Sequence, residues 1–156
     1  MRFYTDEECK RWLGNRPKPD ASGLERHCIA YPKTPSRALY VSQWIASNVM
    51  YRMPALLWVT EPDVWKSNWH LYYRLRQSYH DFRLMDEAPG HLFLEHESED
   101  LATFVQLTIL NGWDAYLLTR ADYINLWFSN DEFIDAYSKE QSLIDIFRKN
   151  VEEKTS

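Results

Sequence analysis

The chain has 156 residues, of which 45% are hydrophobic and 15% aromatic, and its formal net charge is −5. A chain of this length buries roughly 70% of its unfolded surface, so it needs no disulfide or metal to build a core, and we expect a single domain over 1–156. The aromatic content argues against intrinsic disorder. The apolar runs are shorter than a membrane span, and the first residues contain no apolar signal core, which favours a soluble, cytoplasmic protein.

The positions of the cysteines and glycines bear on two kinds of site, disulfide bonds and glycine-rich phosphate loops. Cys9 and Cys28 do not form a CxxC pair, so we expect reduced thiols, with a single disulfide as the alternative. Each of the four glycines lies where we expect an element boundary: Gly14, Gly23, Gly90 and Gly112. The glycine-rich phosphate loops GxGxxG and GxxxxGK(S/T) are not present, which excludes those backbone cradles for nucleotides but not binding by side chains.

The first 14 residues predict a short helix. Thr5 and Glu8 match the capping box, in which each side chain bonds the backbone N–H of the other residue. Gly14 ends the pattern, as glycine often does at a helix C-terminus. Residues 15–23 contain two prolines, Asn and Asp, so we expect a loop there.

Two strands and one ambiguous segment follow. Residues 26–31 fit a short strand that ends at Pro32, and residues 54–60 form a short apolar run bounded by prolines, which is typical of a buried strand. Residues 36–50 fit either a helix or a strand. The helical alternative places Pro35 at the first helical position. Its inward stripe would consist of Ala38, Ser42, Ile45 and Val49.

Residues 62–79 predict a helix with a broad aromatic stripe, because large apolar side chains recur at three- and four-residue spacing. The members are Trp65, Trp69, Tyr72, Leu75 and Tyr79. Basic residues fall between the rings, and we expect them on the outer face. They are Lys66, Arg74, Arg76 and Arg83. Because rings beside cations also bind nucleotides, a nucleotide site within residues 65–83 stays open as an alternative.

The segment from 91 to 120 predicts a strand–helix–strand crossover. We expect strands over 91–97 and 115–120, with a helix over 99–110 that ends at Gly112 in the left-handed conformation. So short a connection requires the two strands to be parallel within one sheet. The strand over 123–129 follows after a short link, which predicts an antiparallel hairpin.

The C-terminal residues predict two helices. Ser129 and Glu132 form a second capping-box pattern, which favours a helix from about Asn130. An apolar stripe predicts a last amphipathic helix over about 143–151. Residues 152–156 are expected to fray.

Taken in chain order, these elements predict an α/β or α+β fold. We expect a mixed sheet of about five strands with helices packed on it, and a C-terminal β-α-β-β-α unit. No internal repeat or low-complexity segment interrupts the chain, which agrees with one domain.

A dense group of charged residues lies at the end of the first crossover strand. If residues 91–97 form a strand, Glu95 and Glu97 lie on one face and His96 on the other. Two carboxylates at this edge of a sheet suit a small carboxylate- or metal-dependent enzyme, which is the alternative function. The HExxH zinc motif is not present, and we expect no metal and no cofactor. Asp114, at the start of the second crossover strand, is expected near the end of the hairpin strand instead.

Charge is unevenly distributed along the chain. Residues 1–90 carry 13 basic and 10 acidic side chains, whereas residues 91–156 carry 5 and 13. An acidic surface makes nucleic acid an unfavourable partner and suits a basic one. The expected binding residues are Glu132, Asp135, Tyr137 and Glu140. The favoured function is a non-enzymatic protein-binding module, of adaptor or immunity type, that docks a basic protein.

Overall fold

The computed structural model describes residues 1–14, 23–49, 53–62, 69–119 and 123–152. Most of the expected N-terminal loop and of the expected frayed tail lies outside these residues. So do Trp65 and Lys66, which belong to the segment 62–79 where a helix was expected. In the part of the chain that the structure describes, no helix is both long enough and apolar enough to cross a bilayer.

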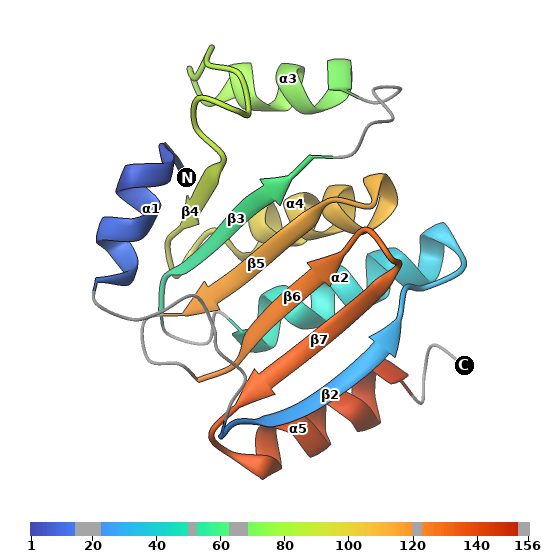
Figure 1. The fold of residues 1–156 in the computed structure, drawn as a ribbon. Coiled ribbons are helices and arrows are strands. Elements are labelled where there is room, and N and C mark those ends of the chain that lie inside the picture. Colours follow the sequence, from blue (N-terminus) through green and yellow to red (C-terminus); the bar gives the residue numbers. More distant parts are fainter. Residues whose placement is uncertain (15–22, 50–52, 63–68, 120–122, 153–156) are drawn as a thin grey trace.

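The fold is α+β, and the described residues form one seven-stranded sheet in which every neighbouring pair of strands is antiparallel (Figure 1). The strands are β1 (Arg2–Tyr4), β2 (Glu25–Ala30), β3 (Ala55–Glu61), β4 (Gly90–Phe93), β5 (Asp114–Thr119), β6 (Asn125–Ser129) and β7 (Phe133–Ser138). Their order across the sheet is β1-β4-β3-β5-β6-β7-β2. The expected number of about five strands is too low, because β1 and β7 are not among the expected strands.

Five α-helices surround the sheet in the described part of the chain. They are α1 (Asp6–Leu13), α2 (Pro35–Val49), α3 (Trp69–Ser78), α4 (Ser98–Asn111) and α5 (Gln141–Phe147), the last continuing as a π-helical segment, Arg148–Glu152. Figure 1 shows α2, α4 and α5 behind one face of the sheet, α1 beside β4, and α3 beyond the ends of β3 and β4. The two faces of the sheet therefore carry different helices.

Strand alternation divides the core into two layers. On β3, Leu57 belongs to the larger cluster beneath α2 and α4, whereas Leu56 and Trp58 belong to a smaller cluster with Cys9 and Leu13 of α1. All five side chains are buried. A strand with both faces buried has no alternation of polar and apolar residues, which explains the continuous apolar run in this segment.

The expected crossover is present, but its two strands are not neighbours. β4, α4 and β5 follow one another along the chain, and α4 lies on one face of the sheet. β3 pairs antiparallel with both β4 and β5, so these two strands point the same way with β3 between them. The two strands are thus parallel within one sheet, as expected. The expectation of a mixed sheet is wrong, because every neighbouring pair of strands is antiparallel. β3 lies between β4 and β5 with both of its faces buried, and this burial of apolar surface stabilises the arrangement.

The expected hairpin of β5 and β6 is confirmed. It brings Asp114 to the end of β6, where the carboxylate accepts a hydrogen bond from the backbone N–H of Asn130 at 2.8 Å. The helix expected from Asn130 is wrong. The chain turns instead, with the N–H of Glu132 donating to the carbonyl oxygen of Ser129 at 3.0 Å and Glu132 at φ 64°. β7 follows this turn, so the C-terminal order is β-α-β-β-β-α.

The wrong prediction of a helix from Asn130 has a local cause. The hydroxyl of Ser129 accepts the backbone N–H of Asp131 at 3.2 Å, much as a capping serine bonds to a nearby N–H. On β7, Ile134 and Ala136 enter the core beneath the helices. The backbone of this strand pairs with β6 on one side and β2 on the other. The local pattern at Ser129 occurs both in turns and at the starts of helices. Pairing of β7 with its two neighbouring strands decides between these alternatives in favour of a strand.

Other local predictions are confirmed. Thr5 and Glu8 form the expected capping box, with bonds of 3.2 and 2.8 Å. α2 settles residues 36–49 as a helix, and all four residues of its expected stripe are buried. α4 ends at Gly112, which is left-handed at φ 61° and ψ 39°.

Gly90 permits the close approach of α1 to the sheet. A Cβ atom at this position would lie 2.2 Å from Sγ of Cys9 and 3.0 Å from Cβ of Tyr4. Cys9 is fully buried, and burial is the largest cause that raises the pKa of its thiol to about 12. It therefore packs as a small neutral side chain.

We expect Gly90→Ala to lower the free energy of unfolding by about 2 kcal/mol, as overpacked cores do. Cys9→Ala removes the sulfur and is expected to cost about 1 kcal/mol alone. Because the sulfur is the nearest obstacle, the double variant should be more stable than the sum of the single losses predicts. Urea unfolding of the four proteins measures this coupling, and strictly additive losses would contradict the packing described.

Gly112 offers a contrasting test, because no heavy atom of the described residues, apart from Gly112 itself and its two chain neighbours, lies within 4 Å of an added Cβ. Gly112→Val should lower the free energy of unfolding by more than about 1 kcal/mol, since a β-branched residue tolerates positive φ badly. Gly112→Asn is the control and should cost less, because asparagine enters the left-handed region more readily. Thermal unfolding followed by circular dichroism compares them. Equal losses would show that the backbone conformation is not the cause.

Candidate functional site

The carboxylates of the acidic cluster do not share a strand face. β4 ends at Phe93, so Glu95 lies in an exposed turn and Glu97 occupies the N-cap position of α4. The carboxylate of Glu97 accepts the backbone N–H of Leu94 at 2.7 Å and forms an ion pair with the amino group of Met1. Burial opposes ionisation of Glu97, but this bond and this charge outweigh it, so its pKa lies below the ordinary value. Glu97 is therefore held by structural contacts.

The enzyme alternative loses the shared strand face that was expected for Glu95 and Glu97. The expected strand over 91–97 is too long, because the backbone turns after Phe93 and the N–H of Glu97 donates to the carbonyl oxygen of Leu94 at 2.9 Å. Within the described ranges, no group of three or more His, Cys, Asp or Glu side chains is placed to hold a metal ion. The catalytic role of Glu95 and Glu97 stays an untested prediction.

The fold separates the four expected binding residues. Asp135 and Tyr137 lie on β7, are buried, and are joined by a bond from the tyrosine hydroxyl at 3.0 Å. Arg26 on β2 donates two further bonds to Asp135, at 3.0 and 2.5 Å. Glu132 and Glu140 are exposed but lie at opposite ends of β7, on the order of 25 Å apart. Binding by these four residues stays a prediction.

Arg76 departs most from the expected pattern, because it lies inside the protein rather than on the outer face of α3. Its exposed fraction is 0%. Its Nε donates to Asp81 at 2.8 Å, and its Nη1 donates to the Tyr72 hydroxyl at 2.9 Å and to the carbonyl oxygen of Ala88 at 3.0 Å. Its guanidinium lies over the ring of Phe3, 4.3 Å from the centroid. The four-residue spacing between Tyr72 and Arg76 places both side chains on one helix face. In the sequence, this spacing was the signal that Arg76 shares the buried face of α3.

A chain of hydrogen bonds leads from Arg76 to His91 on β4. Because Tyr72 accepts from Arg76, its own proton points to Nε2 of His91, 2.9 Å away. Nδ1 of His91 lies 3.2 Å from the carbonyl oxygen of Leu57, which accepts only. These partners assign the neutral tautomer with its proton on Nδ1. Complete burial, followed by the charge of Arg76, lowers the pKa of His91 to about 3.

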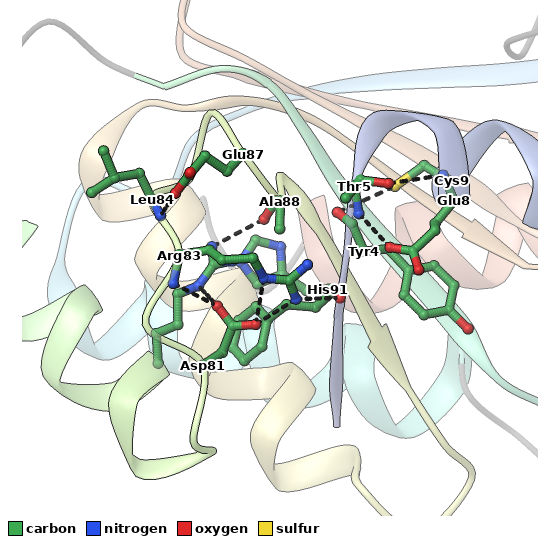
Figure 2. Close-up of polar contacts among 12 residues, drawn as sticks. Tyr4, Thr5, Glu8, Cys9, Asp81, Arg83, Leu84, Glu87, Ala88 and His91 are labelled. Atoms are coloured by element: carbon green, nitrogen blue, oxygen red, sulfur yellow. Dashed lines mark hydrogen bonds and ion pairs between the residues drawn. The ribbon is translucent and has the colours of Figure 1, made fainter.

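Asp81 fixes the segment between α3 and β4, residues 79–89, which we name the anchored loop (Figure 2). Its carboxylate accepts Nε of Arg76 at 2.8 Å, Nε of Arg83 at 2.9 Å and the backbone N–H of Arg83 at 3.1 Å. Burial opposes ionisation of Asp81, but these bonds outweigh it and hold its pKa below the ordinary value. Arg83 also donates to the carbonyl oxygen of Phe3 at 3.0 Å, which ties the loop to β1.

The anchored loop presents apolar side chains to solvent. Phe82 is 76% exposed and Leu84 57% exposed, although the backbone N–H groups of Leu84 and Met85 are both bonded. On α3, Leu71 is also 52% exposed. Three of the seven large apolar side chains that are exposed among the described residues therefore belong to one stretch of chain. Apolar side chains that gather on a surface often mark an interaction site.

A cleft of about 630 Å³ opens where the anchored loop meets β1 and α1. Its size lies within the range of small-molecule sites. Aromatic and cationic side chains predominate in its lining, among them Tyr4, Trp12, Tyr79, Arg2, Arg11 and Arg83. Two side chains of the segment 65–83 therefore reach the cleft, Tyr79 and Arg83. Two others that were considered for ligand binding, Tyr72 and Arg76, lie in the core.

Comparison with known proteins found no matching family model, no matching curated protein and no matching solved structure. The function is therefore inferred from the geometry alone. That inference rests on two features: the exposed apolar side chains of the anchored loop, and the cleft beside this loop.

The buried histidine predicts a loss of stability in mild acid. In the unfolded chain His91 titrates near pH 6.5, whereas in the fold it stays neutral down to about pH 3. Between these values the unfolded state binds the extra proton, so stability falls as the pH falls, by up to about 1.4 kcal/mol per pH unit. His91→Gln keeps a donor and an acceptor but does not titrate, and should flatten this dependence. Urea unfolding between about pH 6 and 5 measures the slope; the same slope in both proteins would exclude His91 as its source.

Proposed function

We propose that the protein is a non-enzymatic protein-binding module, of adaptor or immunity type, and that the anchored loop is its docking element. The observation that carries the proposal is Phe82, which is 76% exposed on a segment that Asp81 holds in place. An aromatic side chain on a rigid support loses little conformational entropy on binding. It therefore suits a partner surface with an apolar pocket, where aromatic anchors contribute most to affinity.

The backbone of the loop supports this role. His80 has a φ of 60°, a left-handed conformation that is uncommon for residues other than glycine. Its N–H donates to the carbonyl oxygen of Gln77 at 2.9 Å, so the chain bends sharply as it leaves α3. Conformations of this kind persist where surrounding contacts hold them and are frequent at functional sites. Here the bonds to Asp81 follow directly after the bend.

The charge of the chain favours a basic partner. Residues 91–156 carry 13 acidic and 5 basic side chains, and Glu132 and Glu140 are exposed. Long-range attraction of this kind raises the association rate more than the final affinity. The proposed partner is thus a protein of net positive charge with an apolar pocket that accepts Phe82.

The first experiment places a photo-cross-linking phenylalanine analogue at position 82 and expresses the chain in its native host. Position 110 is the matched control, because Leu110 is 51% exposed on α4, outside the anchored loop. We expect a discrete covalent adduct from position 82 that position 110 does not give. Identical adducts from both positions would contradict docking through the loop.

The captured protein is then purified and its affinity measured. Phe82→Ala should weaken the complex by at least about 30-fold, which corresponds to a hot-spot residue of about 2 kcal/mol, whereas Leu110→Ala should leave it unchanged. Both variants should keep their melting temperature, because the substituted side chains are exposed. Reversing Glu132 and Glu140 to lysine tests the charge of the partner. Association that keeps its rate and its salt dependence after this reversal would exclude a basic partner.

A further inference from the structure

The carboxylates of the cleft are already engaged in the fold. Three arginines and two carboxylates line the cleft between β1, α1 and the anchored loop. One carboxylate, Asp81, accepts bonds from Arg76 and Arg83. The other, Glu8, accepts the backbone N–H of Thr5 at 2.8 Å in the cap of α1. Both carboxylates are therefore held in place by bonds within the fold.

Two of the arginines are not engaged in this way. Arg2 lies on β1 and Arg11 on α1, both are exposed, and neither side chain has a partner among the described residues. Behind the cleft wall, Nη2 of the buried Arg76 also lacks a hydrogen-bond partner within the described chain. Three arginines against two carboxylates leave the lining with a net positive charge, and a positive concave surface raises the local concentration of anions.

The chemistry of these side chains favours phosphate. A guanidinium group presents planar, paired N–H donors that match phosphate oxygens. Trp12 and Tyr79 add aromatic surface to the same cleft. The ring of Tyr79 is held in place, because its hydroxyl bonds to Asp100 and its edge packs on Phe3 with 6.3 Å between ring centroids. A fixed ring loses little freedom when a flat ligand packs on it.

We propose that this cleft binds a small organic phosphate with a flat ring, of the nucleoside monophosphate class. Arg2 and Arg11 hold the phosphate group, and Trp12 and Tyr79 pack against the ring. The volume of about 630 Å³ suits a ligand of that size. A site made of side chains also agrees with the missing glycine-rich phosphate loops. The proposal goes beyond the docking function and does not rest on Phe82.

Isothermal titration calorimetry of the full chain with AMP, GMP, CMP and UMP tests the proposal. We expect saturable binding of at least one nucleotide at one site per chain. Inorganic phosphate and the matching nucleoside should each bind at least about tenfold more weakly, because each lacks one half of the recognised ligand. Arg11→Gln should weaken nucleotide binding by about tenfold, the loss expected for one hydrogen bond to a charged group.

Arg74→Gln is the matched control, because Arg74 is an exposed cation on α3 that does not line the cleft. This variant should bind the nucleotide as the parent chain does, and both variants should keep their melting temperature. Three results would each overturn the proposal. They are no saturable binding of any of the four nucleotides at millimolar concentration, inorganic phosphate that binds as tightly as the nucleotide, and an equal loss in Arg74→Gln and Arg11→Gln.

Discussion

The guanidinium of Arg76 joins parts of the chain that are distant in sequence. It bonds Tyr72 one turn away on α3, Asp81 in the anchored loop and the carbonyl of Ala88 before β4, and it covers the ring of Phe3 on β1. Taking an ion out of water costs several kcal/mol, and this cost is offset only when the geometry of its partners is good. The network therefore favours one placement of α3 and its loop against the sheet.

The two proposed sites depend on this placement because they lie on opposite sides of the same loop. Asp81 and Arg83 turn toward the network and line the cleft, whereas Phe82 and Leu84 are exposed. Burial alternates along these four residues, so one short stretch of chain supplies both surfaces. A change that weakens the bonds of Asp81 would therefore alter the position of Phe82 and the shape of the cleft together.

The aromatic residues mainly build the core. Around Tyr72, the rings of Trp113 and Phe104 lie 5.3 and 6.2 Å away between centroids, in edge-on contacts. The opposite face of the sheet carries a further stack of Tyr116 on Trp127 at 6.3 Å. Edge-on and offset pairs of this kind add to the energy of apolar burial. These rings build the core, whereas Tyr4, Trp12 and Tyr79 line the cleft.

The features that the sequence predicts correctly depend on residues a few positions apart. The capping box of α1, the left-handed end of α4 at Gly112 and the hairpin of β5 and β6 are of this kind. In each case the bonds or contacts that define the element form within that short segment. Local spacing and turn chemistry were therefore sufficient.

Three features were decided by the tertiary structure instead. β7 is a strand because β6 and β2 pair with it on both sides, although its first residues fit a helix start equally well. β3 lies between the two strands of the crossover with both of its faces buried. Arg76 is buried because Asp81 and Phe3 meet it from other elements, and the cleft exists only where these elements converge. Such outcomes depend on the free energy of contacts between distant residues, which the local pattern of the sequence does not contain.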